Sequence, residues 1–171
     1  MKKKHIILAA VVLLLVVGAS VGIVSCSAYI FVDSTAQSTM ITAYRKMIVR
    51  NVTRVRSEEP ALGHKCDKGG TKVECSTASQ KLEKLFASWR DDMDASKYPK
   101  RYEDAHVATR AALDKLVQGN HLRGQALSAF PISGDARQQL FSQAFELLSE
   151  GASELDEALA SYPPDINITT R

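Results

Sequence analysis

Apolar positions in this chain follow two patterns, one unbroken and one periodic. From residue 6 to residue 32 the sequence contains no charged residue. Further along, apolar residues recur every three or four positions, which is the spacing of one face of an α-helix. No later stretch alternates apolar and polar residues over the length of a β-strand. The pattern therefore predicts an all-α protein, in which an N-terminal transmembrane helix is followed by several amphipathic helices.

The periodic part predicts a small antiparallel bundle of three to four helices. The first is expected to end at Pro60, and the second to begin with a capping box, Thr77 to Gln80. Pro99 is expected in the first turn of the third helix, and Gly119-Asn120 is expected to stop or kink it. Ser133 is the expected N-cap of the last helix. The predicted buried stripes consist of Ile41, Tyr44, Ile48, Val52 and Val55; Leu82, Phe86, Trp89 and Met93; Tyr102, Ala105, Thr109, Ala112 and Leu116; and Phe141, Ala144, Leu148, Ala152, Leu155, Leu159 and Tyr162.

The uncharged run is long enough to cross a membrane. Its residues, Ile6 to Val32, would form a helix of roughly 40 Å, against a hydrocarbon core of about 30 Å. Basic residues flank it on one side only, at Lys2 to Lys4. The positive-inside rule therefore predicts a cytoplasmic flank at residues 1–5 and an extracytoplasmic chain from Asp33 onward. The expected location is the cell membrane, with the lipid bilayer as the partner of Ile6 to Val32.

Three fates of this segment are open. It can stay as an uncleaved single-span anchor, be removed as a signal peptide, or be cleaved before a lipidated Cys26. Ile23-Val24-Ser25-Cys26 resembles the lipobox of bacterial lipoproteins. The chain nevertheless stays apolar after Cys26 as far as Val32, which favours the uncleaved anchor. On this motif the layout resembles small, exported bacterial proteins that are anchored at the N-terminus and helical outside. It is also similar to the sensor bundle of chemoreceptors, but no second spanning segment follows Tyr162.

Charge and cysteine content narrow the class further. The chain has 22 basic and 19 acidic residues, and three of the basic ones are Lys2 to Lys4, so the remainder is formally neutral. A nucleic-acid partner is not expected, because phosphate binding needs a basic surplus. Outside the cytoplasm, Cys66 and Cys75 are expected to form a disulfide across the Gly69-Gly70 turn. The alternative, a metal site of His64 with both cysteines, does not have the spacing of a zinc ribbon.

Candidate catalytic groups are few. Glu103 and His106 form a Glu-x-x-His pair, but di-iron bundles need two such pairs and two further glutamates. The cluster Asp91, Asp92 and Asp94 does not fit the spacing of an EF-hand. We therefore expect neither a metal nor a cofactor, and no enzymatic activity.

The sequence as a whole predicts an extracytoplasmic bundle at residues 33–162 with a flexible tail at 163–171. The expected role is non-enzymatic binding of a protein or another envelope component. One alternative is a small-ligand pocket near Trp89, Tyr102 and Phe141. A second is a metal-dependent enzyme in which Glu103 and His106 meet a glutamate of the last helix, namely Glu146, Glu150 or Glu154.

Overall fold

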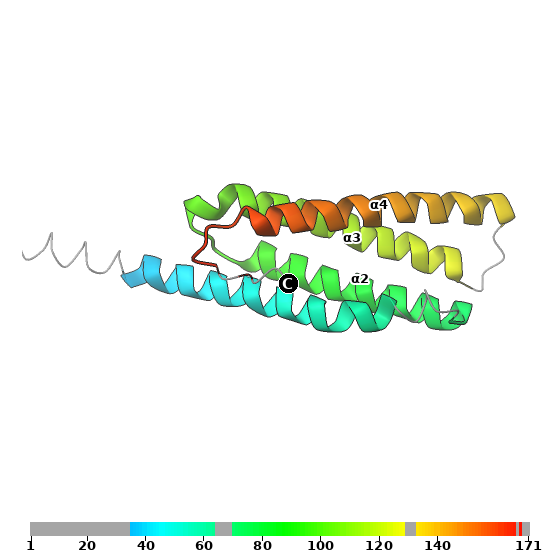
Figure 1. The fold of residues 1–171 in the computed structure, drawn as a ribbon, viewed down its shortest axis with the longest axis horizontal. Coiled ribbons are helices and arrows are strands. Elements are labelled where there is room, and N and C mark those ends of the chain that lie inside the picture. Colours follow the sequence, from blue (N-terminus) through cyan, green and yellow to red (C-terminus); the bar gives the residue numbers. More distant parts are fainter. Residues whose placement is uncertain (1–34, 64–69, 129–132, 167, 169–171) are drawn as a thin grey trace, which may run out of the picture. The chain divides into compact units, whose positions relative to one another are not determined.

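The computed structural model describes residues 35–63, 70–128, 133–166 and 168. Helix 35–63 is followed by α2 (Lys72–Ala95), the 3-10 turn η1 (Lys100–Tyr102), α3 (Glu103–Leu127) and α4 (Gly134–Ala160) (Figure 1). No strand occurs in these described ranges, so the predicted all-α class is confirmed. The chain divides into two compact units, and all side-chain contacts described below lie within the second, Ile41–Arg171.

The predicted membrane anchor is not part of the described structure. Residues 1–5, the segment 6–32 and Cys26 all precede the first described residue. Among the helices that are described, none combines the length and the apolar character needed to cross a membrane.

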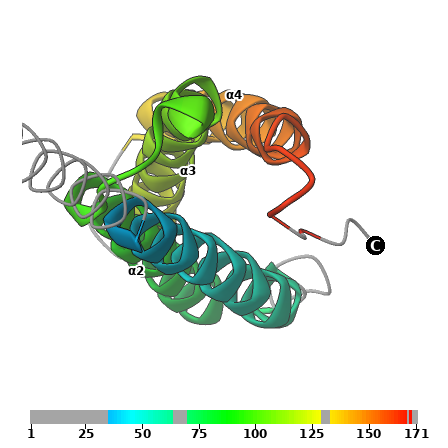
Figure 2. The same ribbon diagram turned by 90° about the vertical axis from the view of Figure 1, so that its left-hand side faces the viewer.

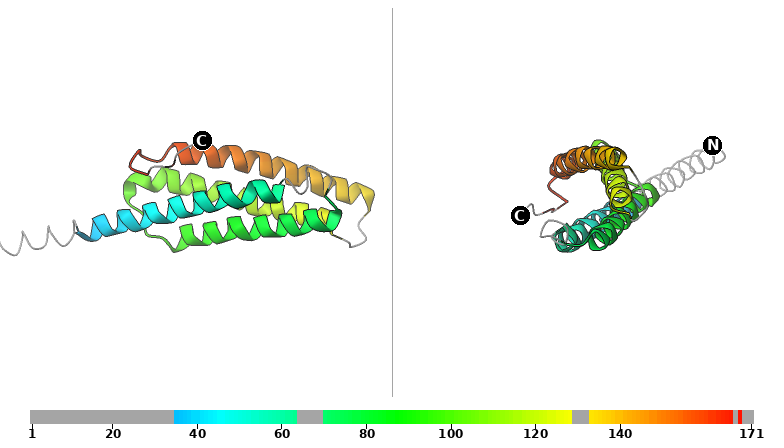
Figure 3. Two further views of the ribbon diagram at one scale, coloured as in Figure 1. Left: turned by 60° about the horizontal axis from the view of Figure 1, so that its bottom comes forward. Right: turned by 90° about the vertical axis from the view of Figure 1, so that its right-hand side faces the viewer.

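The four described helices form an arc that is open on one side. The central helix, α3, packs on both α2 and α4. Viewed from either end, helix 35–63 lies beside α2 at one end of the arc, and α4 forms the other end (Figures 2 and 3). The C-terminal segment after α4 turns back toward helix 35–63 across the open side (Figure 2). The coarse prediction of a helical bundle is therefore confirmed, with an opening between its first and last helices.

The start of α2 differs from the prediction. Its N-cap is Thr71, whose hydroxyl accepts from the backbone N–H of Glu74 at 3.3 Å. The Glu74 carboxylate accepts from the backbone N–H of Thr71 at 2.9 Å, which completes a capping box. Thr77, the predicted cap, lies one turn inside the helix and donates to the carbonyl of Val73. The earlier box is favoured because a glutamate in the first turn also complements the helix dipole.

Two predicted helix stops lie within helices. Helix 35–63 continues past Pro60 for its last three residues, where proline removes only one backbone donor near the helix end. At Gly119-Asn120, α3 continues to Leu127. A Cβ at Gly119 would lie 2.8 Å from Cγ of Leu148, so this glycine allows α4 to approach closely. The predicted stop signal is therefore a packing feature.

The predicted core is largely correct. The largest fully buried side chains include Trp89, Tyr44, Tyr102, Ile48 and Met93. Ser133 caps α4 by accepting from the backbone N–H of Ala136, as predicted. Cys75 is buried in the first turn of α2, while Cys66 lies outside the described residues, so the disulfide between them stays a prediction.

Candidate binding groove

The residues of the predicted metal-dependent enzyme do not converge. Glu103 is exposed in the first turn of α3, whereas His106 is buried with an exposed fraction of 6%. On α4, Glu146 is exposed, and Glu150 and Glu154 both bind Lys115 of α3. Across the described ranges, no three His, Cys, Asp or Glu side chains are placed to hold a metal ion. The geometry that the enzyme alternative requires is therefore not assembled there.

His106 belongs instead to a buried aromatic cluster at one end of the bundle. The hydroxyl of Tyr44 lies 2.9 Å from Nδ1 of His106 and 2.9 Å from the hydroxyl of Tyr162. Tyr98 stacks on the His106 ring at 3.9 Å between centroids, and Tyr102 stacks on Tyr44 at 5.5 Å. These two hydrogen bonds form together when the Tyr162 hydroxyl donates to the Tyr44 hydroxyl and the Tyr44 hydroxyl donates to Nδ1 of His106. The cluster joins helix 35–63, α3 and the C-terminal segment.

Burial controls the protonation of this cluster. It raises the pKa of the Tyr44 hydroxyl far above its usual range, and the hydrogen bond with Tyr162 raises it further. Burial lowers the pKa of His106, an effect to which Arg110 adds and which Asp94 opposes. A neutral His106 can accept at Nδ1, which is the role that the Tyr44 proton requires. The cluster is therefore a neutral hydrogen-bonded core, without an exposed acid or base.

The C-terminal segment is tied to this end of the bundle. Asp165 accepts at one carboxylate oxygen from Tyr102 at 2.7 Å, from Arg45 at 2.7 Å and from Arg101. Burial alone would raise the Asp165 pKa, but the Tyr102 hydrogen bond and the two guanidinium charges lower it. Ile166 is buried in the core. The first part of the predicted flexible tail is thus packed against helix 35–63 and η1.

Further along the opening, a groove lies between helix 35–63 and α4. Helix 35–63 contributes one wall and α4 the other, and α2 and α3 form the floor. Its volume is about 220 Å³. Its lining consists of Val52, Val55, Arg56, Glu59, Phe86, Trp89, Leu116, Ala152, Leu155, Asp156 and Leu159. We refer to these residues as the groove.

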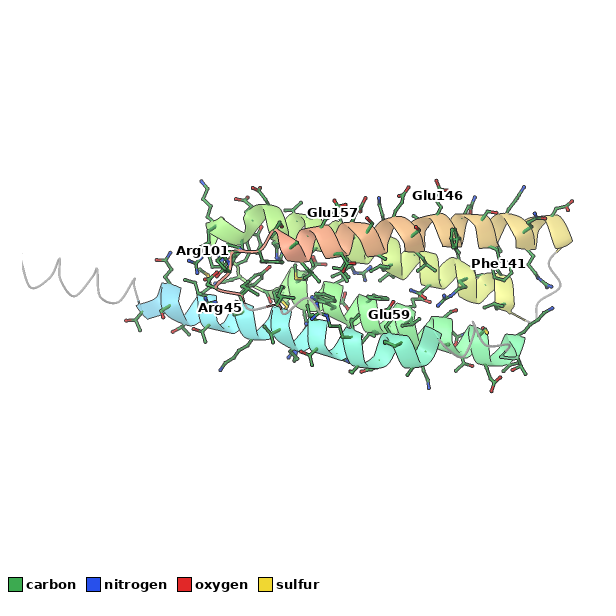
Figure 4. The ribbon with its side chains drawn as sticks, in the orientation of Figure 1. Arg45, Glu59, Arg101, Phe141, Glu146 and Glu157 are labelled. Atoms are coloured by element: carbon green, nitrogen blue, oxygen red, sulfur yellow. The ribbon has the colours of Figure 1, made fainter. Side chains whose placement is uncertain are left out.

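Polar groups of the groove lie at its rim, with one exception. Glu59 is on the side of helix 35–63 that turns toward the other helices (Figure 4). Partial desolvation raises the Glu59 pKa, and the nearby charge of Asp156 on α4 raises it further, against the opposing charge of Arg123. The exception is Trp89, which is 1% exposed and whose indole N–H has no hydrogen-bond partner among the described residues. The groove therefore combines an apolar interior with charged side chains at its mouth, the carboxylates of Glu59 and Asp156 and the guanidinium of Arg56.

Only part of this site is predictable from the sequence. Trp89 lines the groove as predicted, but Tyr102 lies in the aromatic cluster, and Phe141 is exposed on the first half of α4. Glu59 and Asp156 carry no motif, and only the packing of helix 35–63 opposite α4 brings them together. The aspartates of α2 are ion-paired, since Asp92 binds Arg50 and Asp94 binds Arg110, each at 2.6 Å.

Comparison with known proteins gives no relative for this arrangement. No family model, no curated protein and no solved structure matches the chain.

Proposed function

We propose that this protein is a non-enzymatic binding module of the cell envelope, and that the groove takes a side chain of a protein partner. Residues 6–32 would hold it at the membrane, either as a spanning helix or through a lipid on Cys26, with the bundle on the extracytoplasmic side. The observation that carries the proposal is the groove itself, an apolar opening lined from four helices with its carboxylates at the rim.

The size of the groove favours a protein partner over a drug-sized ligand. Small-molecule pockets usually measure about 300–1,000 Å³, and an apolar cavity of about 150 Å³ is enough for a benzene ring. The groove, at about 220 Å³, thus has room for one large side chain. Buried anchor residues in small pockets contribute most of the affinity in many protein interfaces.

Site-directed photocrosslinking in the native membrane tests this proposal. A benzoylphenylalanine at Ala152 would lie in the exposed wall of the groove, and one at Lys84, exposed on α2, serves as the matched control. We expect the probe at position 152 to crosslink one discrete protein that the probe at position 84 does not crosslink. Once purified, that protein should not bind the Ala152→Arg variant. Equal crosslinking from both positions, or none from 152, would overturn the proposal.

A further inference from the structure

The apolar wall of the groove continues along α4 beyond the groove. Phe141, Phe145, Leu148, Ala152, Leu155 and Leu159 are spaced by 4, 3, 4, 3 and 4 residues. We call this set the α4 stripe. In its last half, which lines the groove, Leu155 and Leu159 are buried in the core and only Ala152 is exposed, while Phe141 is 38% exposed and Phe145 is 76% exposed. The spacing places all six on one face of the helix, in the a and d positions of a heptad repeat.

The closest contacts of α4 with α3 are made beside the stripe. Ala144, Gly151 and Ala158 are buried and seven residues apart. At Gly151 a Cβ would lie 3.0 Å from Cγ of Leu116, so the two backbones are in close contact there. Of the stripe, Leu148 also reaches α3, beside Gly119. The exposed phenylalanines are therefore not used to hold α4 in the bundle.

The charge of α4 restricts what can cover the stripe. From Gly134 to Ala160 the helix has six acidic residues and one basic residue. Lys115 pairs with Glu150 and Glu154, but no ion pair within the described ranges involves Glu146, Asp156 or Glu157. Glu146 and Glu157 lie along the outer edge of α4 in Figure 4. Across the groove Glu59 adds a further carboxylate beside Asp156, and Arg56 adds a guanidinium.

This inference, which rests on the proposed function, concerns the chemistry of the partner. We propose that the α4 stripe docks an amphipathic helix of a partner protein, with apolar residues at heptad spacing and lysine or arginine beside them. A heptad repeat matches a second helix, and the part of the stripe that is exposed, from Phe141 to Ala152, is roughly 16 Å long, or three turns. The flanking carboxylates favour a basic partner and disfavour both a second acidic α4 and an anionic lipid surface.

Two matched peptides test the proposal on the full-length protein in nanodiscs of zwitterionic lipid. Each is a helix of about 20 residues with leucine at the a and d positions, flanked by lysine in one and by glutamate in the other. Fluorescence anisotropy of the labelled peptides measures binding, with empty nanodiscs as the blank. We expect the lysine peptide to bind at least about tenfold more tightly than the glutamate peptide.

The stripe variant is Phe145→Ser, and its control is Val73→Ser on α2, because the two side chains are 76% and 73% exposed. We expect Phe145→Ser to weaken the lysine peptide about tenfold or more, and Val73→Ser to leave it unchanged. No binding of the lysine peptide, equal binding of both peptides, or an unchanged affinity in Phe145→Ser would overturn the proposal. Self-association that depends on Phe145 would also overturn it, by assigning the stripe to a second copy.

The two proposals fail in different ways. A partner that crosslinks at Ala152 but binds Phe145→Ser normally leaves the function of the groove standing and removes only the helix docking. Conversely, the peptide could bind in a way that depends on Phe145 while no crosslink is specific to Ala152. That result would support docking on the stripe and would exclude the groove as the site of an anchoring side chain.

Discussion

Replacing Gly151 by alanine should destabilise the bundle, whereas the same replacement at Gly124 should stabilise it. Both glycines lie inside helices, where glycine is less favourable than alanine by about 1 kcal/mol. At Gly124 the new Cβ would meet Cβ of Ser79 at 3.8 Å, which is an ordinary van der Waals contact. We therefore expect Gly124→Ala to raise the free energy of unfolding by up to about 1 kcal/mol.

At Gly151 the space is already taken. The Cβ would lie 3.0 Å from Cγ of Leu116, and 3.1 Å from both the carbonyl oxygen of Ala112 and Cβ of Lys115. Two of these three contacts involve atoms on or next to the backbone of α3, so relief requires the two helices to separate. Overpacking of this kind costs about 1–3 kcal/mol, which exceeds or cancels the gain in helix propensity. The expected net effect of Gly151→Ala is a loss of about 0–2 kcal/mol.

Urea-induced unfolding followed by far-UV circular dichroism measures both variants. Because the propensity gain is common to them, the difference in their free energies of unfolding isolates the cost of overpacking, about 1–3 kcal/mol. Equal midpoints for Gly124→Ala and Gly151→Ala would refute the close approach of α3 and α4.

Three further predictions concern the ends of the bundle and the cysteines. Asp165→Asn should lower the free energy of unfolding by about 1–3 kcal/mol, because Arg45 and Arg101 lose their charged partner. The exposed control Asp91→Asn should change this free energy by less than about 0.5 kcal/mol in the same urea titrations. The pKa of His106 is lowered from 6.5 in the folded state, so on acidification the unfolded chain binds this proton at a higher pH than the folded protein does. The contribution of His106 to stability is therefore full above pH 6.5, and it is lost as the pH falls from there toward the folded pKa. Unfolding series from pH 7.5 to 5.5 should show this loss and its reduction in His106→Gln, and an identical slope in both proteins would contradict it. Thiol titration of the denatured, unreduced protein should find neither Cys66 nor Cys75 reactive, and reduction should lower stability by roughly 2–3 kcal/mol; two reactive thiols besides Cys26 would exclude the disulfide.

Periodicity predicted the helices well where one apolar stripe dominates. The stripe from Tyr44 to Val55 and the one from Leu82 to Met93 are buried as expected. On α4 two apolar faces coexist, and the sequence alone does not reveal which one meets α3. The prediction combined Phe141 with Ala144, whereas the structure buries Ala144 and exposes Phe141. Small residues mark the contact face because they let α3 approach, which is a property of a pair of helices.

Features that depend on distant residues were beyond a one-dimensional pattern. Gly119 looks like a helix stop until Leu148 is placed against it. Asp165 looks like part of a loose tail, because Arg45 and Arg101 come near it only after the whole chain has folded back. The groove likewise follows from the open arc of helices, since neither Glu59 nor Asp156 has a local signal.

The hydrogen bond between Tyr44 and Tyr162 has a consequence for the order of folding. It joins residues 118 positions apart, so it forms only after almost the entire chain has been synthesised. Contacts of such high sequence separation slow folding, because the entropy of closing a long loop is lost before the contact is gained. The packing of α2, α3 and α4 is more local and can form earlier. We therefore expect the C-terminal segment to dock on helix 35–63 last, and truncation before Tyr162 to leave helix 35–63 packed on α2 but without its contact to this segment.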